Sequence, residues 1–172
     1  MGSEQVKGGG KMNRFRQNVL EGKYKEAYEI AQTMKPKDIC DELIAISFDT
    51  KNMLAYGFVV FALLRKETPR YHGIAKTILL TSYVDIPDAG ELALCHVRKA
   101  LEIDENSIEA LLDLMECAEH PDTSATKEDY AWAKAKIAKL YPNDVILECE
   151  YGKKRITPEM LKTSKALRDA NN

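Results

Sequence analysis

The chain has 172 residues, of which 45% are hydrophobic, and this size suits one domain whose core needs neither disulfides nor a metal. Its 25 Lys and Arg nearly balance 27 Asp and Glu, so the formal net charge is −2, which argues against a general nucleic-acid-binding protein. The longest apolar run, the twelve residues from Met53 to Leu64, is too short to cross a bilayer and predicts a central, nearly all-buried helix instead.

The N-terminal segment differs in composition from the rest of the chain. Residues 1–11 contain four glycines and one large apolar residue, Val6, and Met12 could itself be an initiator. We therefore expect residues 1–12 to be a disordered arm or an expression scar, and residues 13–172 to form a single helical-repeat domain.

No secretion signal opens the sequence. The four cysteines form no CxxC pair, which favours free thiols and a cytoplasmic location.

Helical periodicity dominates from residue 13 onward, and breaker residues divide it into segments. Gly22 separates the first two helices, and Pro36 limits the second to about Met34. The next helices are predicted at 38–48, 51–66, 71–83, 89–103, from 106 or 107 to about 118, and 127–140. Residues 145–151 could be a short helix or an extended piece. Thr157, followed by Pro158, starts an amphipathic terminal helix, about 157–169, that suits a cap.

Four sets of small apolar residues recur with the spacing i, i+4, i+7, which places each set on one helical face. Their first members lie 28, 38 and 38 residues apart, close to the length of a helix-turn-helix repeat unit. The sets are Ala27/Ala31/Met34, Ala55/Val59/Ala62, Ala93/Val97/Ala100 and Ala131/Ala135/Ala138. Small side chains at these positions let a second helix approach closely, so the chain is predicted to be all-α and built from about four repeated helical hairpins.

Three segments resemble the tetratricopeptide repeat. Residues 21–28, EGKYKEAY, resemble its turn and second-helix start; residues 99–106, KALEIDEN, resemble its end; and residues 140–144, LYPND, resemble the same end with its proline present. The resemblance implies a right-handed solenoid whose first helices line a concave face that binds peptides or protein surfaces. Thr81, Leu43 and Met115 fall where the family has a first-helix glycine, and other right-handed α-solenoids remain an alternative.

Acidic residues gather in the third quarter of the chain. Between Glu102 and Asp129 there are ten acidic residues and one lysine, whereas residues 151–172 carry a surplus of four positive charges. In the register of the resemblance, Glu109, Asp113 and Glu116 project together from the concave face, opposite Leu111 and Met115. These three residues are the predicted contacts for a protein or peptide partner with a basic surface. A solvated helix face is the simpler reading of the same charges.

No pattern of catalytic, cofactor-binding or metal-binding residues is recognised. His72, His96 and His120 are isolated in the sequence, and Gly8-Gly9-Gly10-Lys11 lacks the setting of a phosphate loop. Trp132 is expected to pack in the core. We therefore expect a non-enzymatic interaction module that uses no cofactor. The alternatives are an immunity-type inhibitor of a basic bacterial toxin or nuclease and, in another class, an enzyme with an unrecognised site.

Overall fold

Eight helices make up the described part of the chain, residues 4–140, in which no strand occurs. The structure is a computed structural model that describes the side chains of residues 10–140. The helices are α1 (Glu4–Leu20), α2 (Tyr24–Ala31), α3 (Pro36–Thr50), α4 (Leu54–Arg65), α5 (Pro69–Ser82), α6 (Ala89–Ile103), α7 (Ile108–Glu119) and α8 (Lys127–Leu140). The predicted all-α class is confirmed over these residues.

Local sequence signals set several of the helix starts. The Thr68 hydroxyl accepts a hydrogen bond from the Tyr71 amide at 3.5 Å, with Pro69 at the first helical position of α5. Ser107 caps α7 in the same way, accepting from the Ala110 amide at 3.3 Å. Gly22, at φ 69°, forms the turn between α1 and α2 in a backbone conformation that glycine adopts without strain.

Other helix ends differ from the predicted ones. α1 begins at Glu4, so the glycine-rich segment expected outside the fold is partly helical; each added residue extends an existing helix by one backbone hydrogen bond. α2 ends at Ala31, about one turn earlier than predicted. α3 begins at Pro36 and continues through Thr50, where a turn was expected, and it ends at Lys51 in the left-handed region with φ 48°.

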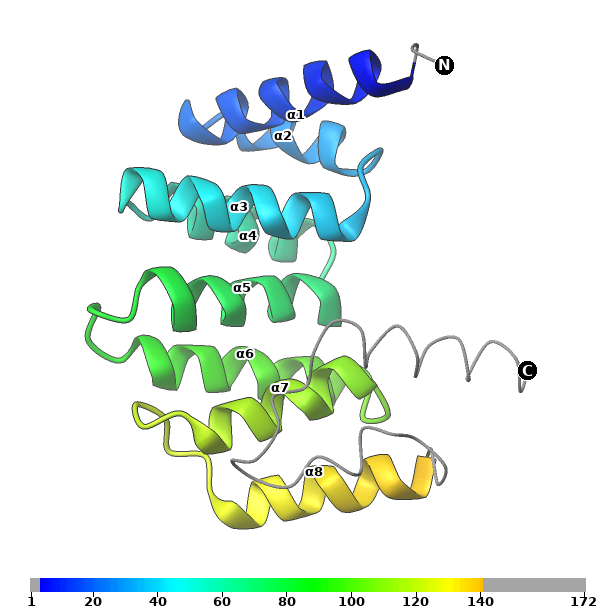
Figure 1. The fold of residues 1–172 in the computed structure, drawn as a ribbon, viewed down its shortest axis with the longest axis vertical. Coiled ribbons are helices and arrows are strands. Elements are labelled where there is room, and N and C mark those ends of the chain that lie inside the picture. Colours follow the sequence, from blue (N-terminus) through cyan, green and yellow to red (C-terminus); the bar gives the residue numbers. More distant parts are fainter. Residues whose placement is uncertain (1–3, 141–172) are drawn as a thin grey trace.

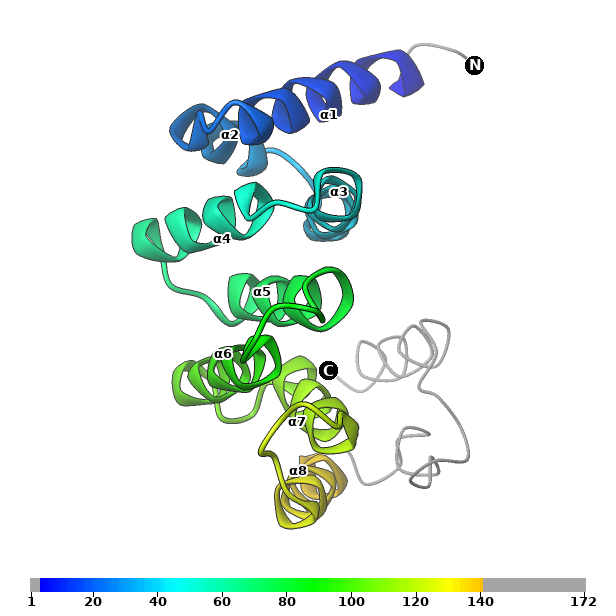
Figure 2. The ribbon, with the colours of Figure 1, turned by 90° about the vertical axis from the view of Figure 1, so that its left-hand side faces the viewer.

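The helices follow one another along the longest axis of the molecule, from α1 and α2 at one end to α8 at the other (Figure 1). The pairs α1–α2, α3–α4, α5–α6 and α7–α8 are in contact, and so are α1–α3, α3–α5 and α5–α7. In the perpendicular view α3 and α7 lie toward one side of the stack, and α4 and α6 toward the other (Figure 2). Each helix therefore packs mainly on helices near it in the sequence.

Small residues let the helices approach closely. All members of the Ala55 and Ala93 sets are buried, as are Ala27 and Ala31 of the first set. Gly57 has the same role, because a Cβ atom there would lie 2.6 Å from the hydroxyl oxygen of Tyr24. That hydroxyl donates to the Leu54 carbonyl at 3.0 Å, which joins α2 to α4.

Two expectations about burial are wrong. α4 is not buried all round: Leu64 is 83% exposed, because the helix packs against its neighbours with one face and presents the other to solvent. In α8 the Ala131/Ala135 face and Trp132 are exposed, and the helix instead buries Ala133 and Ile137. Trp132, 48% exposed, lies beside Lys136, whose ammonium is 5.2 Å from the centre of the ring.

Several predictions fall on residues that the structure does not describe. They are the undecided segment 145–151, the capping helix at about 157–169 and the cysteine at position 149. Over the described residues, no helix combines the length and the apolar character needed to span a membrane.

Candidate functional site

The predicted partner contacts lie on α7, on the side opposite its buried apolar residues. Ser107 starts the helix, and Leu111, Leu114 and Met115 pack into the core. This arrangement leaves Glu109 and Glu116 exposed and Asp113 partly buried. The structure brings two of the three together, since Asp113 and Glu116 contact the same group on α5.

That group is the ammonium of Lys76, a residue that the sequence analysis did not single out. The Lys76 side chain is 4% exposed; its Nζ lies 2.7 Å from Oδ1 of Asp113 and also pairs with Glu116. Burial lowers the pKa of Lys76, but the two carboxylates raise it by more, so the pKa lies above its usual value and the lysine stays charged. Lys76 is the one charged residue between Tyr71 and Leu80, and this isolation was the available signal.

The contacts of Lys76 limit what the acidic face of α7, formed by Glu109, Asp113 and Glu116, can bind. Lys76 neutralises part of the charge of Asp113 and Glu116, so these residues do not offer free carboxylates to a partner. Gly73 leaves room for the contact, because a Cβ atom at this position would lie 3.3 Å from Oδ2 of Asp113. Within residues 10–140, Glu109 forms no ion pair and is the member of the predicted set that remains free to bind.

Polar side chains also join the other odd-numbered helices. Arg16 of α1 donates to Glu42 of α3 at 2.7 Å and pairs with Asp49. The hydroxyls of Ser47 on α3 and Ser82 on α5 are 2.9 Å apart. Together with the Lys76 cluster, these contacts link α1 to α3, α3 to α5 and α5 to α7. Each successive pair among these four helices is therefore joined by at least one polar side-chain contact.

Two of the histidines that are isolated in the sequence meet in the fold. His72 of α5 and His96 of α6 have their Nδ1 atoms 2.9 Å apart. Nε2 of His72 lies 3.2 Å from Oε1 of Glu67, and Nε2 of His96 lies 2.9 Å from the hydroxyl of Tyr56 on α4. The two histidines are 24 residues apart, so no local motif could have indicated the pair.

Burial controls the charge state of His96. Desolvation, followed by the proximity of His72, lowers the pKa of His96 to about 4. His96 is therefore neutral at physiological pH and able to accept a hydrogen bond as well as donate one. Over the described residues, no three His, Cys, Asp or Glu side chains are grouped so that they could hold a metal ion.

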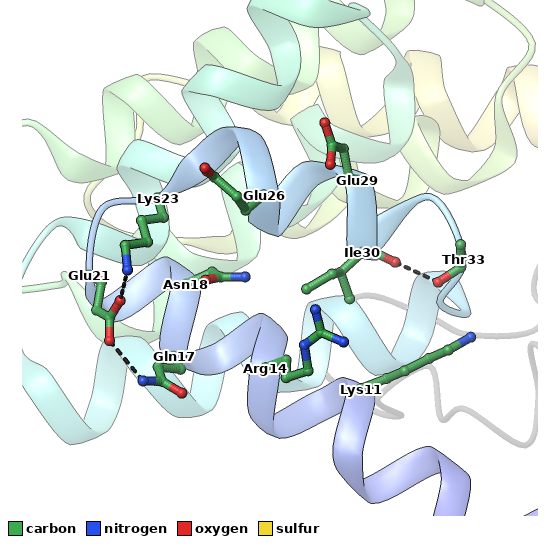
Figure 3. Close-up of a pocket in the computed structure, with 10 residues that line it drawn as sticks. All are labelled: Lys11, Arg14, Gln17, Asn18, Glu21, Lys23, Glu26, Glu29, Ile30 and Thr33. Carbon is green, nitrogen blue, oxygen red and sulfur yellow. Dashed lines mark hydrogen bonds and ion pairs between the residues drawn. The ribbon is translucent and has the colours of Figure 1, made fainter.

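A shallow polar groove of about 630 Å³ lies between α1 and α2 (Figure 3). Figure 3 shows the Glu21 carboxylate held between Gln17, at 2.8 Å, and Lys23, at 2.6 Å. Lys11 and Arg14 on α1 and Glu29 on α2 also line it. The groove is therefore lined by both acidic and basic side chains.

Comparison with known proteins gives no relative: no family model, no curated protein and no solved structure matches this chain. Three regions of the described residues are candidates for a functional site. They are the α7 face with buried Lys76, the histidine cluster and the groove between α1 and α2.

Proposed function

We propose that this protein is a non-catalytic interaction module, a right-handed solenoid of about four tetratricopeptide-like helical hairpins, which binds a protein or peptide partner on the face formed by α1, α3, α5 and α7. The observation that carries the proposal is the packing of each helix on near neighbours, with contacts in order among α1, α3, α5 and α7. Stacked hairpins of this kind present a continuous surface of first helices, the usual binding surface of helical-repeat proteins.

Residues of the first segment that suggested the resemblance, 21–28, support the tetratricopeptide-like interpretation. Gly22 forms the turn of the first hairpin, and Ala27 is fully buried behind it. The Tyr24 ring lies against Phe58 and Phe61 of the next hairpin, with ring centres 6.2 and 6.1 Å away. These positions support the tetratricopeptide-like interpretation over an unrelated helical bundle.

Glu109 is the principal contact that we propose for a basic partner. It is exposed on α7, and its carboxylate has no cation from the described residues to displace. Asp113 and Glu116, whose charge Lys76 partly neutralises, are secondary contacts in this proposal. The partner surface is accordingly expected to place a lysine or arginine next to the first turn of α7.

A second candidate function is an immunity-type inhibitor that neutralises a basic toxin or nuclease. The exposed acidic residues that favour it lie in α7 and in the segments that precede and follow it in the sequence. They are Glu102, Asp104, Glu105, Glu109, Glu119, Asp122 and Glu128. An inhibitor of this kind binds one partner tightly, at a rate that falls with salt, whereas a scaffold binds several partners more weakly. An enzyme with an unrecognised site is the third class, which turnover by the purified protein would reveal.

The test is affinity capture from a lysate of the native source at low and high salt, with three single charge reversals. Glu109→Lys removes the proposed contact; Glu128→Lys makes the same change of charge on α8; and Glu29→Lys alters the groove of Figure 3. Loss of one stoichiometric partner with Glu109→Lys alone supports the proposal. Loss with Glu29→Lys instead would move the binding surface to the groove, and capture unchanged by Glu109→Lys would reject the α7 contact.

Reversing Asp113 or Glu116 would be a poor test, although the sequence alone suggests it. Either change would place two cations side by side around buried Lys76 and destabilise the α5–α7 contact. A loss of binding in such a variant would not distinguish a missing contact from a disturbed fold.

A further inference from the structure

The histidine cluster joins three successive helices through side chains alone. Tyr56 comes from α4, His72 from α5 and His96 from α6, and Glu67 lies in the connection between α4 and α5. His72 is 5% exposed in its side chain, whereas Glu67 is 57% exposed. The chain of contacts therefore runs from a solvent-facing carboxylate through a buried imidazole to a partly buried hydroxyl.

When both imidazole rings are neutral, one arrangement of protons satisfies every hydrogen bond of the cluster. The ionised Glu67 carboxylate only accepts, so Nε2 of His72 must carry a proton and its Nδ1 must be the acceptor. Nδ1 of His96 then donates to His72, its Nε2 accepts, and the Tyr56 hydroxyl donates. The tautomers of both rings are fixed by the carboxylate at one end.

One additional proton can be accommodated without losing a contact. If either ring becomes an imidazolium, a single proton still lies between the two Nδ1 atoms, and Nε2 of His96 donates to the Tyr56 oxygen. A second proton cannot be accommodated, because both Nδ1 atoms would then carry hydrogens while lying 2.9 Å apart. Two positively charged rings with centres 5.2 Å apart also repel each other.

We propose that the Tyr56–His96–His72–Glu67 chain is a pH-sensitive lock between α4, α5 and α6, which holds one proton between the imidazoles and opens when both rings become charged. Opening loosens the contact between α5 and α6, because the side chain of His72 is 5% exposed and the two charged rings, one on each helix, must move apart. The lowered pKa of His96 agrees with this mechanism, since burial and the neighbouring ring both oppose its charge.

The other charged groups near the Tyr56–His96–His72–Glu67 contacts do not supply a counterion for a second proton. On α6, Cys95 and Lys99 act electrostatically on Tyr56 and Glu67, respectively. The groups that α3 and α7 bring toward α5 are Cys40, Asp113 and Glu116, and these surround Lys76 instead. Two imidazole nitrogens are also too few to hold a metal ion, and no third ligand from the described residues joins them.

The test combines nitrogen NMR of the imidazoles with amide hydrogen exchange, from about pH 7 down to about pH 3.5, which lies below the pKa of about 4 of His96. In the wild type we expect two fixed tautomers at neutral pH and, on acidification, amide exchange in α6 that rises about 10-fold beyond its intrinsic pH dependence. His120 serves as an internal reference ring outside the cluster.

Two variants separate the lock from a general effect of acid. His96→Gln removes the second titrating ring, so α6 exchange should change less than about 2-fold over the same range. Glu67→Ala removes the acceptor of Nε2 of His72 at an exposed position, so it should leave the fold intact while the tautomer of His72 is no longer fixed. Both rings titrating independently in the wild type, with α6 amides still protected, would overturn the proposal; so would unchanged tautomers in Glu67→Ala.

Discussion

Replacing Gly90 with alanine tests whether the connection between α7 and α8 lies against the start of α6. A Cβ atom at Gly90 would lie 1.9 Å from the carbonyl oxygen of Asp122 and 2.6 Å from its carbonyl carbon. Both neighbours are backbone atoms, so no side-chain rotation can relieve the overlap. The connection is held there by a second contact, because the Ser124 hydroxyl donates to Glu91 at 2.8 Å.

The expected cost follows from two opposing effects. Restoring an ordinary contact distance requires a backbone shift of more than 1 Å, and such overpacking costs about 1–3 kcal/mol. Alanine in place of glycine inside a helix recovers about 1 kcal/mol at most. Because the overlapping atoms are backbone atoms, we expect a cost near the upper end of that range, about 2–3 kcal/mol. After the gain from alanine, Gly90→Ala should lower the free energy of unfolding by about 1–2 kcal/mol, or the melting temperature by about 2–8 °C.

Urea unfolding followed by circular dichroism measures this change. Gly10→Ala is the matched control, because Gly10 is also helical and has nothing within 4 Å of its added Cβ. The control should be neutral or slightly stabilising. A Gly90→Ala protein as stable as the wild type would show that the α7–α8 connection does not approach α6 so closely.

Three other measurements follow from buried or exposed groups. Lys76→Met leaves two carboxylates of α7 without their cation and should cost about 3 kcal/mol in urea unfolding, whereas Lys99→Met, at an exposed ion pair, should leave the unfolding midpoint unchanged. Unfolded His96 binds a proton near pH 6.5, but the folded protein holds its pKa at about 4, so stability should fall as the pH is lowered through this range. At about 1.4 kcal/mol for each unit between these two pKa values, the loss is about 3 kcal/mol, and it should be absent from His96→Gln; equal pH profiles would contradict it. Trp132→Ala should change stability by less than about 0.5 kcal/mol, and the tryptophan should already be accessible to acrylamide in the folded protein; strong protection would contradict its exposure.

Helix positions could be predicted because their signals are local. Ala89–Ile103 and Lys127–Leu140 match the predicted helices at both ends. The same periodicity misplaced Trp132, because two faces of α8 carry alanines and only packing against α7 selects the Ala133 face. Periodicity shows that a face can be buried, but the neighbouring helix decides which face is.

Less of the candidate site than of the helix positions could be predicted from the sequence. The spacing of Asp113 and Glu116 places them on one face of α7, but their partner Lys76 lies 37 and 40 residues away in the sequence. His72 and His96 likewise meet only because α5 packs on α6. Contacts of this kind depend on the register between helices, which a single sequence does not specify.

The position of Lys76 has a consequence for any ligand of the acidic face. A cation tethered inside the fold has a high effective concentration at Asp113, and dilution does not lower it. A soluble lysine or arginine must compete with that tethered cation for Asp113, but it meets no such competitor at Glu109. Recognition at this face is therefore expected to discriminate by geometry, favouring partners whose positive charges reach Glu109 at the start of α7 over partners that are merely basic.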